Sequence, residues 1–484
     1  MTGVDKQEMI LPVLSLCLAL CCCAAENELS VYPTVLQERA TTGSLVIRLT
    51  DEITLNLEKS SVLADKLLVV TSNEDGNQVD AVETSAIQDN LYHDSHHRSS
   101  LMVRQRDGAL EVEGVVNSRL RVKPLPQAER SLQGQILHSV YEVQEIKDDI
   151  VKMEPRLKSS YWRQWYPNWP PFFTRPTTQK PRTHVARFVV EVHVVSDKEH
   201  QKHFPKNEEL IAYLAVMTNA VNLRYLDMRR PNITFKLVGI TRNTDDVFAH
   251  EVYDTLEATQ TLENLVTYYK EGNIPGYPDA VYLITGRDLS SIENGVLQKG
   301  VAGLAFLGRL CTKLAVAEGE DIAGSYSGVY PMAHELAHIL GAEHDESPRC
   351  PWSAGYLMSY VDGGTNKYKL SVCSEEQIRR TVLKATDICL RETSKTNYMD
   401  QHRKFPGQKL ADVSYCRKML KQYGGRHNVV TARKPWNLAS KCKMRCCFQQ
   451  GYQIWCQEVD ILEGMACSGQ RTCRRGVCGN HRWA

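Results

Sequence analysis

The sequence has no cysteine between Ala24 and Leu310, so disulfide bonds are excluded from more than half of the chain. After residue 25 it also lacks any stretch long and apolar enough to cross a membrane, which excludes a later membrane span. Cysteine is instead concentrated near the C-terminus, where 12 of the 16 cysteines lie at or beyond Cys311. Any covalent framework of the protein therefore belongs to its C-terminal part.

An apolar run from Met9 to Ala25 ends in the small residues Ala24 and Ala25. This run is short for a membrane helix and is typical of a secretory signal peptide, which we predict over residues 1–25. The mature protein should then be secreted to the extracellular space. An even number of cysteines in that oxidising compartment predicts six disulfides.

The segment Ala333–Asp345 contains three histidines and a glutamate at a chemically informative spacing. His334 and His338 are four residues apart, so a helix places both imidazoles on one face, while Glu335 is displaced by roughly 100°. Gly341 can end that helix in a left-handed conformation and turn the chain so that His344 becomes a third ligand. Three imidazoles on Zn²⁺ leave one position for water, and Glu335 can take the proton of that water. The pattern predicts a zinc endopeptidase of the EC 3.4.24 type.

With these residues, the chain resembles the metzincin metallopeptidases. Met358 lies at the distance of the methionine turn beneath their metal, and Asp345 after the third histidine is similar to the reprolysin (adamalysin, M12B) branch. Tyr360 is similar instead to the zinc-binding tyrosine of astacins, or is a packed or surface residue. The resemblance implies an α/β fold of the α+β metzincin kind: a mixed, twisted five-stranded sheet with the zinc helix and a small C-terminal subdomain. It also implies a mainly β propeptide and a disulfide-rich C-terminal module.

Composition divides the chain after the signal peptide. Alternating patterns over residues 44–49 and 109–116 predict strands in a segment without cysteine, and Pro and aromatic residues crowd between Tyr161 and Pro181. We therefore expect the following domains: signal peptide, 1–25; propeptide, 26–157; linker with the activation cleavage, 158–184; reprolysin-like protease domain, 185–395; basic cysteine-rich (disintegrin-like) module, 396–484.

Periodicity within the protease domain predicts its main elements. Strands are expected at residues 186–195, 233–240, 279–286 and 303–308, and helices at residues 208–226 and 261–270. The resemblance implies that Gly303, Leu304 and Ala305 form an edge strand whose free backbone groups pair with an extended substrate. An ordinary internal strand is the alternative.

The resemblance also implies a structural calcium site formed by Glu191, Asp279, Glu392 and the Cys389 carbonyl, although the family commonly has asparagine in place of Glu392. Surface carboxylates without a metal are the alternative. It further implies the disulfides Cys311–Cys389 and Cys350–Cys373. Asn232 begins the only glycosylation sequon that we identify, Asn-Ile-Thr.

Many related proenzymes keep their zinc blocked with a propeptide cysteine, a device that is unavailable to this chain. Latency must use another ligand or steric cover. His93, His96 and His97 could reach a metal, or could lie in a solvated polar loop. The linker contains no convincing dibasic cleavage site.

Charge is unevenly distributed along the chain. From Arg403 to Ala484 there are 16 Lys and Arg against 4 Asp and Glu, a net charge of +12, which leaves −11 for the rest. In a secreted protein such a tail favours sulfated glycans, cell surfaces or acidic protein patches over nucleic acid, or is simply solvated. No Arg-Gly-Asp tripeptide supports integrin binding.

The order of these segments resembles that of secreted salivary metalloproteases of ticks with an ADAMTS-like tail. The resemblance implies a toxin-like enzyme that degrades host fibrinogen, fibrin or matrix proteins. A competing hypothesis is a binding protein that acts through its basic cysteine-rich module, with proteolysis secondary.

Overall fold

The computed structural model describes residues 28–39, 43–73, 76–143, 183–392, 411–420, 430–450, 452–462, 464–474 and 476–481. We refer to residues 28–143, 183–392 and 411–481 as the N-terminal, central and C-terminal regions. The predicted signal peptide, almost all of the predicted linker 158–184, and the boundaries at residues 157 and 396 lie outside the described residues. Within the described part, no helix is long and apolar enough to span a membrane.

The central region is built on a mixed sheet. Four strands run parallel, in the order β20 (Val316–Glu320), β16 (Ala280–Thr285), β12 (Arg187–Ser196) and β13 (Asn232–Asn243). A fifth, β19 (Gly303–Ala305), pairs antiparallel with β20 at one edge. These strands are rich in Val, Ile and Leu because both faces of the sheet are covered. The expected mixed sheet of five strands is confirmed.

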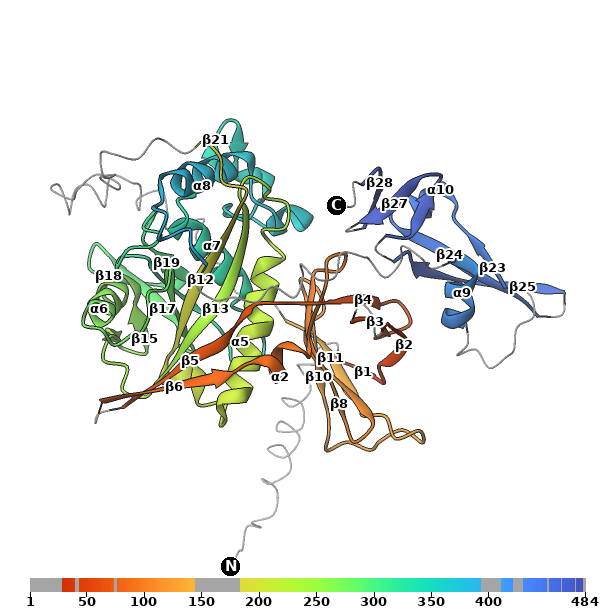
Figure 1. The fold of residues 1–484 in the computed structure, drawn as a ribbon, viewed down its shortest axis with the longest axis horizontal. Coiled ribbons are helices and arrows are strands. Elements are labelled where there is room, and N and C mark those ends of the chain that lie inside the picture. Colours follow the sequence, from red (N-terminus) through yellow and green to blue (C-terminus); the bar gives the residue numbers. More distant parts are fainter. Residues whose placement is uncertain are drawn as a thin grey trace, which may run out of the picture.

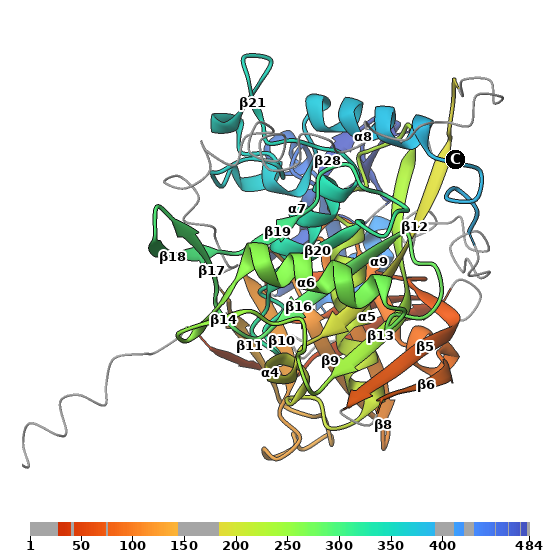
Figure 2. The same cartoon turned by 90° about the vertical axis from the view of Figure 1, so that its left-hand side faces the viewer.

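Helices cover both faces of this sheet. α5 (Asn207–Asn222) and α7 (Val329–Ile339) share one core with Phe188 and Val192 of β12. α6 (Ala258–Lys270) packs on the other face against Val281 and Val316, and Figure 2 shows it crossing that face. α8 (Val372–Lys384) follows the zinc-motif segment. Shorter elements complete the region: α4 (Lys198–Gln201), β14 (Glu251–Val252), β15 (Thr255–Glu257), β17 (Leu289–Glu293), β18 (Val296–Val301), β21 (Glu346–Ser347), β22 (Cys350–Pro351), η3 (Trp352–Ala354) and η4 (Gly364–Tyr368).

Two strands of the N-terminal region extend the central sheet. β5 (Leu63–Asn73) pairs parallel with β13, and β6 (Gly76–Glu83) pairs antiparallel with β5, which makes a sheet of seven strands. We did not predict this addition, since pairing between segments about 170 residues apart leaves no local pattern in the sequence. It covers the edge of β13 that would otherwise be open.

The rest of the N-terminal region is mainly β, as expected. Nine strands form one sheet in the order β1-β11-β10-β9-β8-β7-β4-β3-β2. The bounds are β1 (Leu29–Val31), β2 (Thr34–Arg39), β3 (Ser44–Arg48), β4 (Thr54–Lys59), β7 (Leu91–Asp94), β8 (Ser99–Arg106), β9 (Ala109–Val115), β10 (Leu120–Pro124) and β11 (His138–Glu142), with helix α2 (Ser85–Gln88) before β7. Arg121, fully buried, donates to the carbonyls of Ser325 and Tyr326 just before α7.

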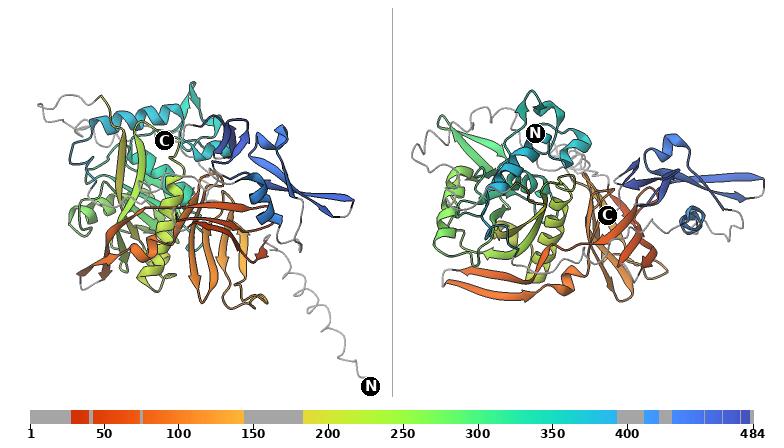
Figure 3. Two further views of the ribbon diagram at one scale, coloured as in Figure 1. Left: turned by 45° about the vertical axis from the view of Figure 1, so that its right-hand side comes forward. Right: turned by 45° about the horizontal axis from the view of Figure 1, so that its top comes forward.

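The C-terminal region consists of small sheets and short helices held by four disulfides. These are Cys416–Cys446, Cys442–Cys473, Cys447–Cys456 and Cys467–Cys478. The elements are α9 (Asp412–Leu420), β23 (Val430–Arg433), α10 (Trp436–Ala439), β24 (Lys443–Gln450), β25 (Gln453–Asp460), β26 (Ala466–Ser468), β27 (Arg471–Arg474) and β28 (Val477–Gly479). Figures 1 and 3 show the N-terminal sheet lying between the central region and the C-terminal region.

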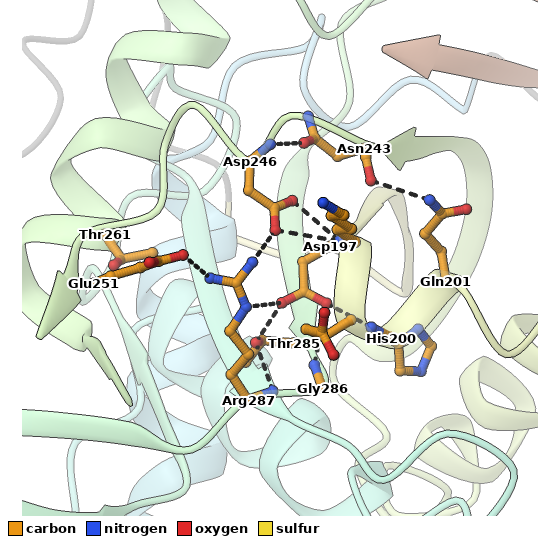
Figure 4. Close-up of polar contacts among 12 residues, drawn as sticks. Asp197, His200, Gln201, Asn243, Asp246, Glu251, Thr261, Thr285, Gly286 and Arg287 are labelled. Atoms are coloured by element: carbon orange, nitrogen blue, oxygen red, sulfur yellow. Dashed lines mark hydrogen bonds and ion pairs between the residues drawn. The ribbon is translucent and has the colours of Figure 1, made fainter. Parts of the chain in front are cut away.

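A polar cluster joins the carboxyl ends of β12, β13 and β16 (Figure 4). Arg287 lies between Asp197, Asp246 and Glu251, and its Nη1 is 2.6 Å from Glu251 Oε1. Asp197 also accepts a hydrogen bond from Thr285 Oγ1 at 2.7 Å. Burial, followed by the charge of Asp197, raises the pKa of Asp246 to about 6. The guanidinium therefore balances carboxylates that these strand ends bring together, which is a structural role.

Candidate zinc-binding active site

The zinc-motif histidines lie where helix spacing predicts. His334 and His338 are on one face of α7, and the helix ends after Ile339. Gly341 follows with φ of 99°, and its N–H donates to the His338 carbonyl at 2.8 Å. A side chain at 341 would meet Thr381 Oγ1 at 2.2 Å, so glycine is required for both backbone and space. The chain reverses here and brings His344 back to the helix.

Three ring nitrogens converge at this point. His344 Nε2 lies 3.0 Å from His334 Nε2 and 3.2 Å from His338 Nε2. Two nitrogens bound tetrahedrally to zinc at 2.0–2.1 Å are separated by about 3.3 Å, so the three residues fit this metal. The other ring nitrogens are held by carbonyls, His334 Nδ1 by Leu357 at 2.8 Å and His338 Nδ1 by Ala342 at 2.7 Å. These contacts select the tautomer that presents Nε2 to a metal.

The surroundings also favour a neutral imidazole at His338. Burial, then the charges of His344 and His334, hold the pKa of His338 well below its ordinary value. Asp345 is buried beside the third histidine, where its N–H donates to the Met358 carbonyl and its Oδ1 accepts from Ser371 Oγ at 2.5 Å. Ser371 caps the N-terminus of α8. Asp345 thus connects the His344 turn to two neighbouring segments.

Glu335 lies between the metal-binding histidines and the edge strand. A Cβ at Gly303 would be 2.8 Å from Glu335 Cγ and 3.0 Å from its Oε1, so the side chain rests directly on the backbone of β19. Within the described residues, β19 ends the sheet and has β20 as its partner. Gly303, Leu304 and Ala305 are therefore placed to pair with a further strand next to this carboxylate.

Met358 is fully buried in the core below the histidines. Tyr360 lies against the third histidine, with ring centroids 4.9 Å apart, and its hydroxyl donates to Glu346 Oε1 at 2.6 Å. In this arrangement the tyrosine is a packed neighbour of His344 whose hydroxyl already has a carboxylate partner.

The structure places a buried cation, Lys236, next to one of the residues suggested for calcium. Asp279 Oδ2 accepts the Glu191 N–H at 2.9 Å, and Lys236 pairs in register with Glu191 across β12 and β13. The buried ammonium of Lys236 lies 3.1 Å from Glu392 Oε1. Cys389 contributes its side chain to a disulfide. The ammonium of Lys236 is therefore an alternative partner for Glu392, and the calcium site stays a prediction. Lys236 was missed because its position in the sequence is that of an ordinary strand residue.

Other predicted residues have clear positions. The structure contains the disulfides Cys311–Cys389 and Cys350–Cys373. Asn232 is exposed as the first residue of β13.

His93 contacts Ser60, whereas His97 lies between Asp94 and Asp460 and is largely buried, so it does not belong to a solvated loop. In the basic tail, Lys443 and Arg445 form ion pairs with Asp460 and Glu458, which lowers the free positive charge there.

A helix carrying two histidines of the zinc motif, a third histidine after a glycine turn and a sheet with an antiparallel edge strand are together typical of zinc metalloproteases of the metzincin class. Residues 187–394 match the family described as Reprolysin (M12B) family zinc metalloprotease. The chain therefore carries a reprolysin-family zinc metalloprotease domain.

Curated relatives agree with this family. An antarease-like venom metalloproteinase of Tityus trivittatus is 27% identical over 343 residues, covering 64% of this chain and 82% of the relative. The venom metalloproteinase BumaMPs1 of Olivierus martensii is 27% identical over 383 residues, covering 75% and 92%. A Bombyx mori protein, a disintegrin and metalloproteinase with thrombospondin motifs like, is 27% identical over 322 residues, covering 60% and 44%.

Proposed function

We propose that the protein is a secreted endopeptidase that cuts extended segments of extracellular proteins, with His334, His338 and His344 as zinc ligands and Glu335 as the base. Three Nε2 atoms converge on α7 and the turn after it, and the side chain of Glu335, also on α7, rests against the edge strand. This arrangement carries the proposal. When bound, zinc supplies Lewis-acid polarisation of the scissile carbonyl and makes an attacking water more acidic.

The residues of the chain account for the other requirements. The backbone of Gly303–Ala305 would pair with the substrate and hold it extended, which limits cleavage to unfolded or loop segments. Glu335 would accept the proton of the attacking water on its carboxylate and deliver it to the leaving amine. Carbonyl contacts keep the imidazoles of His334 and His338 aimed at one point while this happens. The relatives described as venom metalloproteinases support an extracellular site of action. Fibrinogen, fibrin and matrix proteins are the candidate substrates that the resemblance to tick salivary enzymes implies.

A chelator-controlled digest tests the proposal. The purified protein should cut these candidate substrates, with sites mapped by mass spectrometry, and a zinc chelator should stop the cleavage. Glu335→Gln should reduce the cleavage rate by at least about 10³-fold while keeping bound zinc and the unfolding temperature. Glu343→Gln, an exposed change on the same turn, is the control and should cleave normally. Cleavage by Glu335→Gln at the wild-type rate would refute the mechanism.

A further inference from the structure

Strand β3 of the N-terminal region is buried on both faces. Leu45 and Ile47 point into the core of the N-terminal sheet. Val46 points the other way and is buried among Tyr415, Met419 and other residues of the C-terminal region. Because successive residues of a strand face opposite sides, one strand is shared by two hydrophobic cores. Leu36 of β2 packs against the same C-terminal core.

Polar contacts surround this apolar surface. Arg48 Nη1 donates to the Met419 carbonyl at 3.4 Å, and Gln457 Nε2 donates to the Asp51 carbonyl at 3.3 Å. Both bonds join residues more than 370 positions apart in the chain. The C-terminal region therefore has a matched surface for the N-terminal region, with an apolar centre and polar edges.

The turn between β7 and β8 adds a charged contact. His97 Nδ1 lies 3.2 Å from Asp94 Oδ2, and its Nε2 lies 3.4 Å from Asp460 Oδ2 in the C-terminal region. Lys443 contacts the other oxygen of Asp460 at 3.2 Å. His96 approaches Gly476, where a Cβ would be 2.8 Å from the imidazole. One short turn thus contributes two histidines to the interface.

The next residue of the same turn faces the central region. The Arg98 guanidinium lies 4.4 Å from the centre of the Tyr368 ring. Tyr368 precedes Lys369, whose carbonyl accepts the Leu357 N–H at 2.9 Å, and the Leu357 carbonyl in turn holds His334 Nδ1. The turn His96–Arg98 is therefore connected on one side to the C-terminal region and on the other to the support of a zinc-ligand histidine.

We propose that the C-terminal region adds to the strand pairing of β5 with β13 in keeping the N-terminal region bound to the protein after the chain is cut between residues 144 and 182, and that the turn His96–Arg98 transmits this attachment to the zinc site. The C-terminal region then acts as a latch, in a chain that has no cysteine available in its N-terminal region for blocking zinc. The attachment is independent of the proposed function, and only its effect on peptide hydrolysis rests on that function.

Release of the N-terminal region after a controlled cut tests the latch. The full chain would carry Glu335→Gln to prevent self-digestion and an inserted site for a sequence-specific protease between residues 144 and 182. After cutting and dilution, size-exclusion chromatography would follow the dissociation rate. Val46→Asp and Asp460→Asn should each raise this rate at least about tenfold. The control Glu458→Gln, on the same strand as Asp460 but paired with Arg445 inside the C-terminal region, should stay within about twofold of wild type.

Dissociation at the wild-type rate in both variants would overturn the proposal, as would immediate release of the N-terminal region from the cut wild-type protein. If the Asp460→Asn variant fails to form its disulfides, the dissociation rates of Val46→Asp and Arg48→Ala test the proposal in its place, because both changes lie outside the disulfide-bonded region. In the chain with Glu335 intact, the same variants should reach full peptidase activity sooner after the cut. Faster release with an unchanged course of activity would overturn the link to the zinc site.

Discussion

At the scale of single residues, the zinc site depends on groups that orient the ligands as much as on the ligands. Leu357 and Ala342 contribute only backbone carbonyls, yet these fix which nitrogen of His334 and His338 is available to a metal. Because any residue type can supply a carbonyl, the sequence contains no sign of these two contacts. The convergence of the three histidines was predictable, since His334 and His338 are one helical turn apart and Gly341 allows the chain to reverse towards them.

Lys236 provides a stability prediction at the same scale. Lys236→Met removes the buried ammonium from the Glu392 carboxylate, and we expect a loss of about 2 kcal/mol in the free energy of unfolding. This is less than the roughly 3–5 kcal/mol of a fully buried pair because the Glu392 side chain is 31% exposed. Denaturant unfolding of the wild-type protein and the variant, with the disulfides intact, would measure this difference in the free energy of unfolding.

Lys299→Met is the control, because the ion pair of Lys299 with Asp254 is on the surface, where solvent screening leaves it little effect on stability. Thermal unfolding in millimolar calcium would test the calcium site. An unchanged unfolding temperature is expected where Lys236 takes the place of the metal at Glu392, and a clear rise would support calcium instead.

At the scale of elements, the end of α7 decides whether the third ligand arrives. Gly341→Ala would place a methyl group in a left-handed conformation and against Thr381, so we expect a loss of about 1–3 kcal/mol in stability and weaker zinc binding. Zinc affinity by competition with a chelating dye, together with thermal unfolding, would show both effects.

Gly272→Ala is a matched control. Gly272 follows the end of α6 with φ of 92°, and a Cβ there would meet no atom within 4 Å. The Gly272→Ala variant should lose some stability because of backbone strain, and it should bind zinc as the wild-type protein does. Equal zinc affinity in the two variants would show that the Gly341 turn does not position His344.

Elements were predicted well where their pattern is local. The strand predicted at residues 186–195 is β12 (Arg187–Ser196), and the helix predicted at residues 261–270 lies within α6 (Ala258–Lys270). The helix predicted at residues 208–226 ends earlier, at Asn222. The apolar pattern continues past that point because Leu223 and Tyr225 are also buried, but these two residues lie in a turn and not in the helix.

At the scale of the whole molecule, the charged turn between the N- and C-terminal regions predicts how their attachment depends on pH. Burial alone would lower the pKa of His97, but Asp94 and Asp460 raise it to about 10. Burial would raise the pKa of Asp94, but His97 lowers it to about 2. The other charged groups facing this turn are His96, whose pKa is lowered by burial and His97, and Lys443.

The histidine contribution is complete below the ordinary pKa of 6.5 and is lost as pH rises through about 10. The Asp94 contribution is complete above 3.8 and is lost as pH falls to about 2. The dissociation rate of the cut protein should therefore be lowest between about pH 4 and pH 6.5, should rise as pH increases from 6.5 towards 10, and should level off above pH 10. A rate that increases as pH falls from 8 to 6 would contradict this charge arrangement.

The sequence by itself was enough to predict zinc chemistry, because His334, Glu335, His338, Gly341 and His344 lie within one helix and its turn. Local geometry relates such positions without knowledge of the rest of the chain. The same is true of the individual strands and helices, whose periodicity is a local property.

Only the tertiary structure decided which distant segments meet. The pairing of β5 with β13, the place of Lys236 among carboxylates, and the contact of His97 with Asp460 all join residues far apart in the sequence. Such contacts depend on how whole sheets pack, and no spacing within a single segment encodes them. The physical reason is that chemistry at the metal needs a few neighbouring side chains, whereas the attachment of one region to another needs surfaces that only folding assembles.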